Sequence, residues 1–448
     1  MRKVGIISLG CVKNLVDAEL MLGDLAAHQL TITPDPEEAD IIIVNTCGFI
    51  ESAQQESVDT IIQMAEYKKD KCQMLLVSGC LAQRFSSELL VEIPEIDAII
   101  GTGSWQKIRE AIERVDKGEK PVVIIDELTN IYTEDMPRVL TTPSYSAYIK
   151  VAEGCSNRCA YCVIPSVRGD FRSRSMESIL AEAKNLVNQG VREINLIAQD
   201  TTNYGTDLYG ERRLPALLRE LIKIENIEWI RLLYCYPYNF TDELIDLMAT
   251  EPKICSYVDL PLQHISDDVL RRMNRRDTKA DIEALLKKIR DRIDGVVIRS
   301  SFIVGFPGET EADFEELKEF IETQKFERVG IFTYSREAGT PAYDMENQIP
   351  QEVKEDRYHT LMATQCVISE KINQSYEGEM LTVLVEGKDS EQEGLAYGRS
   401  YREAPDIDGK IFIENEPNPA IGTFIQTEVI QGFTYDLVVE KISSETKE

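Results

Sequence analysis

Glu153-Gly154-Cys155-Ser156-Asn157-Arg158-Cys159-Ala160-Tyr161-Cys162 is the stretch around which the rest of the chain is organised. Its cysteines are spaced C-x3-C-x2-C and follow an apolar, strand-like run, an arrangement suited to an iron-sulfur cluster. A four-iron cluster has one iron more than this loop has thiolates, so one iron would stay open to a ligand that is not protein. A structural zinc site would need a fourth Cys or His close by. The only histidines of the chain are remote from the loop in sequence: His28, His264 and His359.

Length and composition narrow the class of protein. A chain of 448 residues is long enough for two or three domains. It has ten cysteines and an N-terminus without the apolar region of a secretory signal. This indicates a reducing compartment, in which thiols serve metal binding and not disulfides. No stretch approaches the ~20 consecutive apolar residues of a membrane span, so we expect a cytoplasmic protein with no membrane partner.

The charge of the chain bears on its partners. The formal net charge is -29, from 78 acidic and 49 basic residues. Nonspecific binding to a phosphate backbone depends on Lys and Arg, so direct RNA binding is not expected. A basic protein is an electrostatically easier partner, although the acidity could also serve solubility alone.

Residues 1–118 are predicted to form a small parallel α/β domain. Its strands are expected at residues 4–8, 41–45 and 74–78, and its helices at 12–27, 51–67 and 82–91. Each strand is followed within a few residues by a cysteine, namely Cys11, Cys47 and Cys80. Parallel strands end at one edge of their sheet, where open α/β sheets bind ligands. Unless the pattern is a coincidence, these thiols meet in one crevice and hold a second three-cysteine cluster.

After a turn-rich linker at residues 119–144, strands and helices alternate regularly through residue 350. Strands are expected at 147–151, 193–197, 229–233, 257–260, 296–303 and 328–334, and helices at 176–188, 214–224, 242–249, 279–292 and 311–322. This alternation predicts an open (β/α)6 barrel. The Cys155 loop follows its first strand, at the strand end where such barrels carry their chemistry.

Two further loops at that end of the barrel could touch a cofactor. Gly305 opens the loop after the fifth strand, which turns sharply and could aim backbone amides outward. The other interpretation is a plain strand-helix turn with Thr310 as helix cap. His264 follows the fourth strand and is either a polar residue near the cofactor or a structural histidine.

The chain changes character after a predicted linker helix at residues 351–375. Residues 376–442 contain β-rich runs broken by glycines, which predicts a small five-stranded antiparallel barrel. The runs lie at 381–386, 410–413, 423–430 and 437–441. Small barrels of this kind often bind RNA, but acidic residues outnumber basic ones here. A basic protein surface is therefore the better partner.

Taken together, these motifs resemble the methylthiotransferases, a two-cluster family of radical S-adenosylmethionine (SAM) enzymes with an N-terminal cysteine-bearing domain, a radical SAM partial barrel and a TRAM barrel. The resemblance covers essentially the whole chain. Of the two branches of this MiaB/RimO family, one modifies a tRNA adenosine and the other an aspartate of a small-subunit ribosomal protein. Residues 8–19 and 398–409 look like the aspartate-modifying branch, because the tRNA branch usually has Gln-x-Asn after its first cysteine.

The resemblance implies a role for each cysteine group. Cys155, Cys159 and Cys162 would hold the 4Fe-4S cluster that cleaves SAM, and Cys11, Cys47 and Cys80 the auxiliary 4Fe-4S cluster. Tyr161 would lie near the cofactor adenine, with packing as its other role. The implied reaction is hydrogen abstraction from the aspartate β-carbon, sulfur insertion and SAM-dependent methylation.

This chemistry is borne by cofactors, so no catalytic side chain is expected. A reducing donor such as flavodoxin or ferredoxin would be needed. The alternatives are the same reaction on tRNA, and a ribosome-associated iron-sulfur protein that does not turn over.

Overall fold

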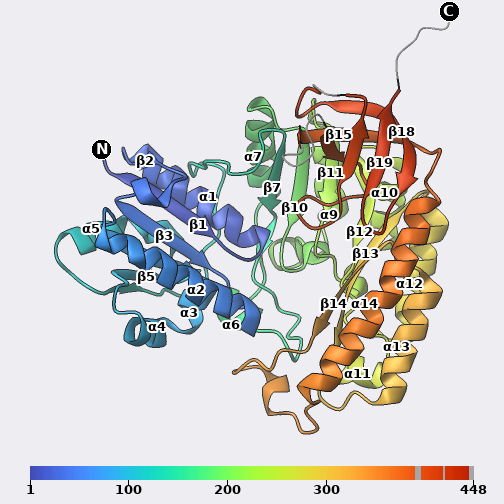
Figure 1. The fold of residues 1–448 in the computed structure, drawn as a ribbon, viewed down its shortest axis with the longest axis horizontal. Helices are drawn as coiled ribbons and strands as arrows, with labels where there is room; N and C mark the ends of the chain where they lie inside the picture. Colours follow the sequence, from blue (N-terminus) through green and yellow to red (C-terminus); the bar gives the residue numbers. More distant parts are fainter. Residues whose placement is uncertain (389–394, 417–418, 443–448) are drawn as a thin grey trace, which may run out of the picture.

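The computed structural model describes residues 1–388, 395–416 and 419–442. Within them lie two open sheets of six strands each and a closed five-stranded barrel, in chain order from blue to red in Figure 1. This is the predicted α/β architecture. The expected domain boundaries at 1–118, 145–350 and 376–442 remain predictions, and β6 (Val122–Ile124), beyond residue 118, still pairs with the first sheet.

The N-terminal sheet is parallel throughout, in the order β2-β1-β3-β4-β5-β6. Its other strands are β1 (Lys3–Ser8), β2 (Thr31–Ile32), β3 (Ile41–Thr46), β4 (Met74–Gly79) and β5 (Ala98–Ile100). Strands β3 and β4 are buried along their whole length, as expected for strands covered on both faces. The helices of this part are α1 (Val12–Ala27), α2 (Glu51–Glu66), α3 (Cys80–Arg84), α4 (Ser86–Glu92) and α5 (Ile108–Asp116). The helix expected at 82–91 is divided in two at Phe85, whose ψ of 36 is not helical.

The central sheet is the predicted open (β/α)6 barrel, because its strands are parallel in the order β14-β13-β12-β11-β10-β7 and the ring is not closed. Its strands are β7 (Ser146–Lys150), β10 (Glu193–Ile197), β11 (Trp229–Leu232), β12 (Ile254–Asp259), β13 (Val297–Val304) and β14 (Arg328–Thr333). A short hairpin, β8 (Ala152–Glu153) with β9 (Arg172–Ser173), follows β7. The helices are α6 (Ile164–Arg168), α7 (Met176–Asn188), α8 (Thr206–Tyr209), α9 (Leu214–Leu221), α10 (Asp242–Thr250), α11 (Asp267–Arg272), α12 (Lys279–Arg292), α13 (Glu311–Gln324) and α14 (Gln351–Gln374).

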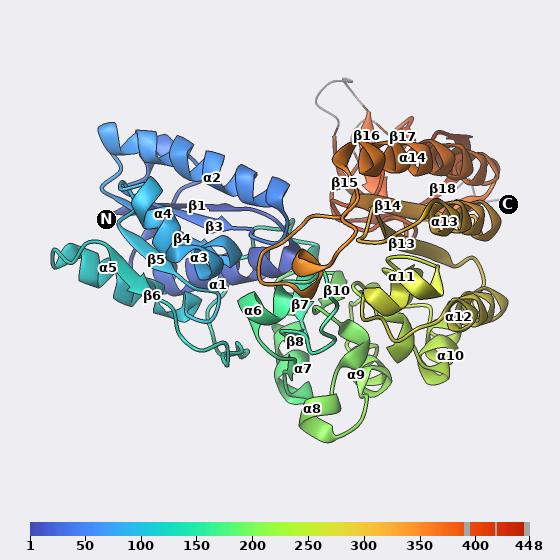
Figure 2. The same cartoon turned by 90° about the horizontal axis from the view of Figure 1, so that it is seen from below.

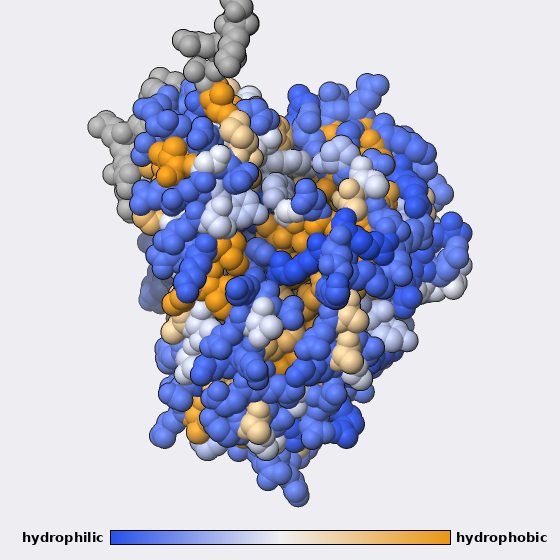
Figure 3. All heavy atoms as spheres, turned by 90° about the vertical axis from the view of Figure 1, so that its right-hand side faces the viewer, coloured by the Kyte–Doolittle hydropathy of each residue, from blue (hydrophilic) through white to orange (hydrophobic). Residues whose placement is uncertain are grey.

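Local sequence explains where the outer helices of the barrel begin. Helices α12 and α13 each start with a capping box, formed by Thr278 with Asp281 and by Thr310 with Asp313. In each box the side chains satisfy backbone N–H groups that have no partner inside the helix. The outer face of these helices is largely hydrophilic, with apolar side chains visible in the recesses between them (Figure 3).

The C-terminal barrel closes in the order β15-β16-β17-β19-β18. Its strands are β15 (Met380–Lys388), β16 (Ala396–Arg399), β17 (Ile411–Glu414), β18 (Phe424–Gly432) and β19 (Leu437–Lys441). Pairing is antiparallel as predicted, except that β17 and β19 run parallel. Strand β16 is short, and the sequence pattern did not predict it.

The loop after β16 is buried against the inner face of the central sheet. Glu403 of this loop pairs with Arg328 at 3.2 Å, and both side chains are buried. Asp408 accepts a hydrogen bond from Tyr257 at 2.6 Å. Arg399, at the end of β16, pairs with Glu193 at the start of β10. The loop therefore fills the barrel at the amino ends of its strands, opposite the cysteine loop.

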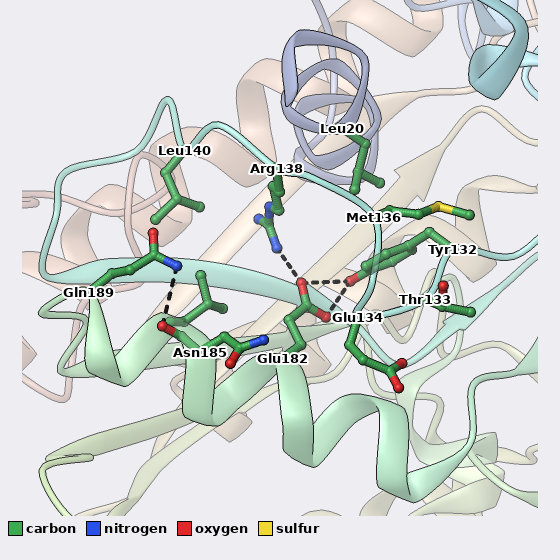
Figure 4. A pocket seen from close by; sticks show the side chains of 11 residues that line it. Leu20, Tyr132, Thr133, Glu134, Met136, Arg138, Leu140, Glu182, Asn185 and Gln189 are labelled. Carbon is green, nitrogen blue, oxygen red and sulfur yellow. Dashed lines mark hydrogen bonds and ion pairs between the residues drawn. The ribbon is translucent and has the colours of Figure 1, made fainter. Parts of the chain in front are cut away.

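The linker between the first two sheets is anchored by a buried arginine. Arg138 pairs with Glu19 of α1 at 2.6 Å. It also pairs with Glu182 of α7 at 2.6 Å, and Tyr132 donates to Glu182 at 2.9 Å (Figure 4). The small pocket beside this cluster is lined by none of the candidate cysteines. The ion pairs of Arg138 connect the two sheets. The sheets meet where α1 packs beside β7 and α3 beside α6 (Figure 2).

Candidate functional site

The first cysteine group, Cys155, Cys159 and Cys162, will be called the barrel triad. It lies in the loop after β8, at the carboxyl end of the first strand of the central sheet. All three thiols are free, and Cys159 is buried. Burial, with smaller effects of Asp200 and Cys159, raises the pKa of Cys155 to about 11. The pKa of Cys162 is raised as well, first by burial and then by Cys159 and Cys155. The three sulfur atoms therefore lie within electrostatic reach of one another, in a place where thiolates need a positive partner such as a metal.

Backbone contacts fix the shape of the loop that carries this triad. Gly154 has a φ of +74, and a Cβ there would lie 2.2 Å from the carbonyl oxygen of Asp170. The Cys155 amide donates to the carbonyl oxygen of Gly169 at 3.0 Å, and the Ala160 amide to that of Met273 at 2.9 Å. Tyr161 packs edge-on against Phe306, with ring centres 6.5 Å apart. The triad is thus presented on a loop held from two sides.

The second group, Cys11, Cys47 and Cys80, will be called the N-terminal triad. These residues follow β1, β3 and β4, and the structure brings them together at one edge of the N-terminal sheet, as the strand ends predicted. Burial, together with the nearby Cys11 and Cys80, raises the pKa of Cys47 to about 12. A Cβ on Gly10 would lie 2.8 Å from the Cys47 sulfur, so only glycine lets the first loop pass so close to it.

Each triad has the donor chemistry of an iron-sulfur site. Such clusters are held by cysteine thiolates, and each triad supplies three free cysteines.

A buried ionic network joins the two triads, and sequence reasoning did not find it. Arg168 of α6 donates to Asp17 of α1 at 2.7 Å and to Glu153 at 3.2 Å. Lys150 of β7 pairs with the same two carboxylates. Arg168 also donates to Asn14, whose side-chain oxygen is 3.8 Å from the Cys80 sulfur. Glu153 comes two residues before Cys155, so the network connects both cysteine loops.

Lys13 of α1 is a second feature that the sequence analysis missed. Its side chain crosses from the N-terminal sheet to the central sheet, with Nζ 2.8 Å from the centre of the Tyr234 ring. Burial lowers the pKa of Lys13 to about 8, while the nearby Cys11 and Asp259 raise it. Tyr234, in the loop after β11, has the left-handed φ of 62. The only signal in the sequence was a charged residue beside a candidate ligand.

Turn geometry had suggested that the Gly305 loop could aim its amides outward, but the structure shows that the Gly305 amide does not point outward. The amides of Gly305 and Phe306 donate to the carboxylate of Glu309, at 2.7 and 3.2 Å. Burial raises the pKa of Glu309 to about 7, and Arg357 opposes this from 2.7 Å. The loop is thus satisfied internally, and Thr310 caps α13 as expected for a plain turn.

His264 is enclosed by protein. It is fully buried, and its Nδ1 accepts a hydrogen bond from the Ser266 amide at 3.0 Å. Burial lowers its pKa to about 3, so the ring is neutral at ordinary pH. This environment favours the structural interpretation of His264.

The remaining cysteines lie apart from both triads. Cys72, Cys235 and Cys255 are buried, as expected for ordinary core thiols. Cys366 is only partly buried, and its sulfur lies 2.9 Å from the hydroxyl of Tyr435.

Three family models match the chain, each over a different sheet. They are the uncharacterized protein family UPF0004 over residues 3–101, the radical SAM superfamily over residues 149–321 and the TRAM domain over residues 378–442. A partial barrel with C-x3-C-x2-C after its first strand, matched by the second of these models, defines the chain as a radical SAM protein.

Curated relatives match over nearly the whole length. The ribosomal protein uS12 methylthiotransferase RimO of Desulforamulus reducens is 53% identical over 441 residues, covering 98% of this chain and 99% of the relative. The protein of the same name from Geobacter sulfurreducens is 50% identical, with 98% and 99% covered. The chain therefore belongs to the RimO family of ribosomal protein uS12 methylthiotransferases.

Solved structures support the fold alone. The radical SAM methyltransferase TsrM of Kitasatospora setae, solved with tryptophan and a SAM analogue, superposes with a TM-score of 0.57 at 14% identity, covering 84% of this chain and 90% of that one. The cobalamin-dependent radical enzyme OxsB, in its form with SAM bound, gives a TM-score of 0.51 at 13% identity, with 83% and 56% covered. Within the described residues, no helix is long and apolar enough to cross a membrane.

Proposed function

We propose that this protein adds a methylthio group to the β-carbon of an aspartate in ribosomal protein uS12. Family membership supports the reaction and the substrate. The observation that carries the proposal is the pair of incomplete triads. They stand on two different sheets, yet one buried network of Asp17, Lys150 and Arg168 holds their loops together.

In this proposal the barrel triad holds one 4Fe-4S cluster and the N-terminal triad the other. When bound, these clusters and SAM would supply the radical, the sulfur and the methyl group. The chain itself positions and shields them. Gly154 lets the cysteine loop turn tightly, Tyr161 and Phe306 form an apolar wall beside it, and the ionic network keeps the two loops at a fixed separation.

The proposed partners follow from charge and chemistry. A ribosomal protein is basic in general, so the net charge of -29 would favour its approach and disfavour direct RNA binding. The reaction needs electrons, for which we propose a small donor such as flavodoxin or ferredoxin. We place the protein in the cytoplasm, where its thiols would stay reduced.

Substrate choice can be tested directly. Reconstituted, reduced enzyme is incubated anaerobically with SAM and either uS12 or hypomodified tRNA, and each product is examined by mass spectrometry. We expect a methylthio mass gain on one aspartate of uS12 and none on tRNA. Modification of tRNA alone would overturn the proposal. Absence of both products and of deoxyadenosine would indicate an iron-sulfur protein that does not turn over.

A further inference from the structure

Lys13 is a buried cation that no carboxylate of the described residues pairs with. Its side chain is 5% exposed, and no described residue gives it a hydrogen bond or ion pair. Its one direct contact is with the face of the Tyr234 ring. Lys13 is not completely sealed, because 5% of the residue stays exposed. A charge held this way is costly unless something compensates it.

The carboxylates near Lys13 are already engaged. Asp259 pairs with Arg299 at 2.8 Å and accepts the Tyr234 amide at 2.8 Å. Glu153 accepts from Lys150 at 2.8 Å and from Gln199 at 2.9 Å. Both act on the charge of Lys13 only through space, as does the Cys11 thiol, whose effect is the larger one. The hydrogens of the Lys13 ammonium group are therefore available for an anion from outside the chain.

The position of this charge is also specific. Lys13 lies two residues after Cys11 of the N-terminal triad, and its ring partner Tyr234 belongs to the loop after β11, on the cysteine-loop side of the central sheet. An anion bound here would sit between the two triads. Arg168 and Lys150, two further buried cations of this interface, are each paired with two carboxylates and are not available.

We propose that Lys13 binds the side-chain carboxylate of the substrate aspartate, an inference that rests on the proposed function. The reacting β-carbon is bonded directly to the carboxyl carbon. A cation that holds the carboxylate therefore fixes the β-carbon beside the N-terminal triad. It also predicts that a neutral side chain of similar shape, such as asparagine, would be rejected, because Lys13 would stay buried and unpaired in that complex.

The test compares uS12 with a uS12 variant carrying Asn at the target position, using reconstituted holoenzyme. Anaerobic fluorescence anisotropy gives the Kd of each, and mass spectrometry gives kcat/KM for the Asp form. Wild type should bind the Asp form about 30-fold more tightly or better, the effect of one buried charge pair. Lys13→Met should bind the Asp form as weakly as wild type binds the Asn form, and its own affinity for the Asn form should not change. Its kcat/KM for the Asp form should fall by about the same 30-fold factor. Lys13→Arg, which keeps the charge, should recover part of the preference.

Iron content and the electron paramagnetic resonance spectrum of reduced Lys13→Met show whether its clusters are intact. Lys287→Met, at an exposed lysine of α12, is the control and should match wild type. The inference is wrong if Lys13→Met still binds the Asp form more tightly than the Asn form. This includes the case in which the variant binds both forms more weakly than wild type by the same factor. If wild type does not modify uS12 at all, the proposed function has failed instead.

Discussion

Replacing Asp17 by Asn tests the network that joins the two triads. The change keeps the shape of the side chain but removes the negative charge that faces Lys150 and Arg168, whose side chains are each 3% exposed. Removing one partner of a buried ion pair typically costs about 3–5 kcal/mol, because the remaining charge stays buried and uncompensated. Glu153 still faces both cations, so we expect the lower end, about 3 kcal/mol.

Asp116→Asn is the matched control. Asp116 pairs with Arg2 at 2.8 Å, much as Asp17 does with Arg168, but its side chain is 42% exposed. Exposed pairs of this kind contribute about 0–1 kcal/mol. The two substitutions make the same chemical change, from Asp to Asn, and differ mainly in how deeply the carboxylate is buried.

The assay is urea unfolding of the reduced apoprotein, followed by tryptophan fluorescence. The chain has two tryptophans, and both Trp105 in the N-terminal part and Trp229 on β11 are buried. Single Trp→Phe variants then report each part separately. We expect Asp17→Asn to lower the free energy of unfolding at both probes and Asp116→Asn to change neither by more than about 1 kcal/mol. Equal, small effects of both substitutions would refute the claim that burial makes this network important.

Three further predictions concern the triads and the barrel contact. Replacing the N-terminal triad by alanines should lower the iron content from roughly eight to about four per chain, measured by iron assay; loss of none would exclude that site. Gly154→Ala should displace the barrel triad and lose about half of the iron. Gly118 also has a positive φ, but a Cβ there would have no neighbour within 4 Å, so Gly118→Ala should keep all of its iron. The same iron assay is applied to both variants. Burial would raise the pKa of Glu193, but Arg399 outweighs this and holds it at about 2, against 4.5 in the unfolded chain. The stability that this carboxylate contributes is present above pH 4.5 and is lost as the pH falls towards 2. Protection of the C-terminal barrel against hydrogen exchange should therefore fall over that pH range. A fall of equal size in Glu193→Gln would contradict the assignment to Glu193.

Much of the site could be predicted because its signals are local in sequence. The C-x3-C-x2-C loop is contained in ten residues, and each cysteine of the N-terminal triad follows an apolar strand within a few residues. The parallel order of those strands then brings the cysteines to one edge without further information. The same strand pattern predicted the open barrel, whose six strands lie within a few residues of the expected positions.

What could not be predicted depends on contacts between distant parts of the chain. Asp17 and Arg168 are 151 residues apart, and nothing in either neighbourhood marks them as partners. Turn geometry alone left open whether the loop after β13 aims its amides outward, because it does not show that Glu309 accepts those of Gly305 and Phe306. The parallel pairing of β17 with β19 depends likewise on how the barrel closes.

The buried loop after β16 has a consequence for how this protein can be divided or recombined. Because Glu403 and Asp408 complete the inner surface of the central sheet, the C-terminal barrel is not an appendage that can be exchanged freely. A chain shortened after α14 would leave Arg328 and Tyr257 without these partners and open the floor of the barrel to water. Chimeras with other TRAM barrels should therefore need residues 399–409 of the native chain.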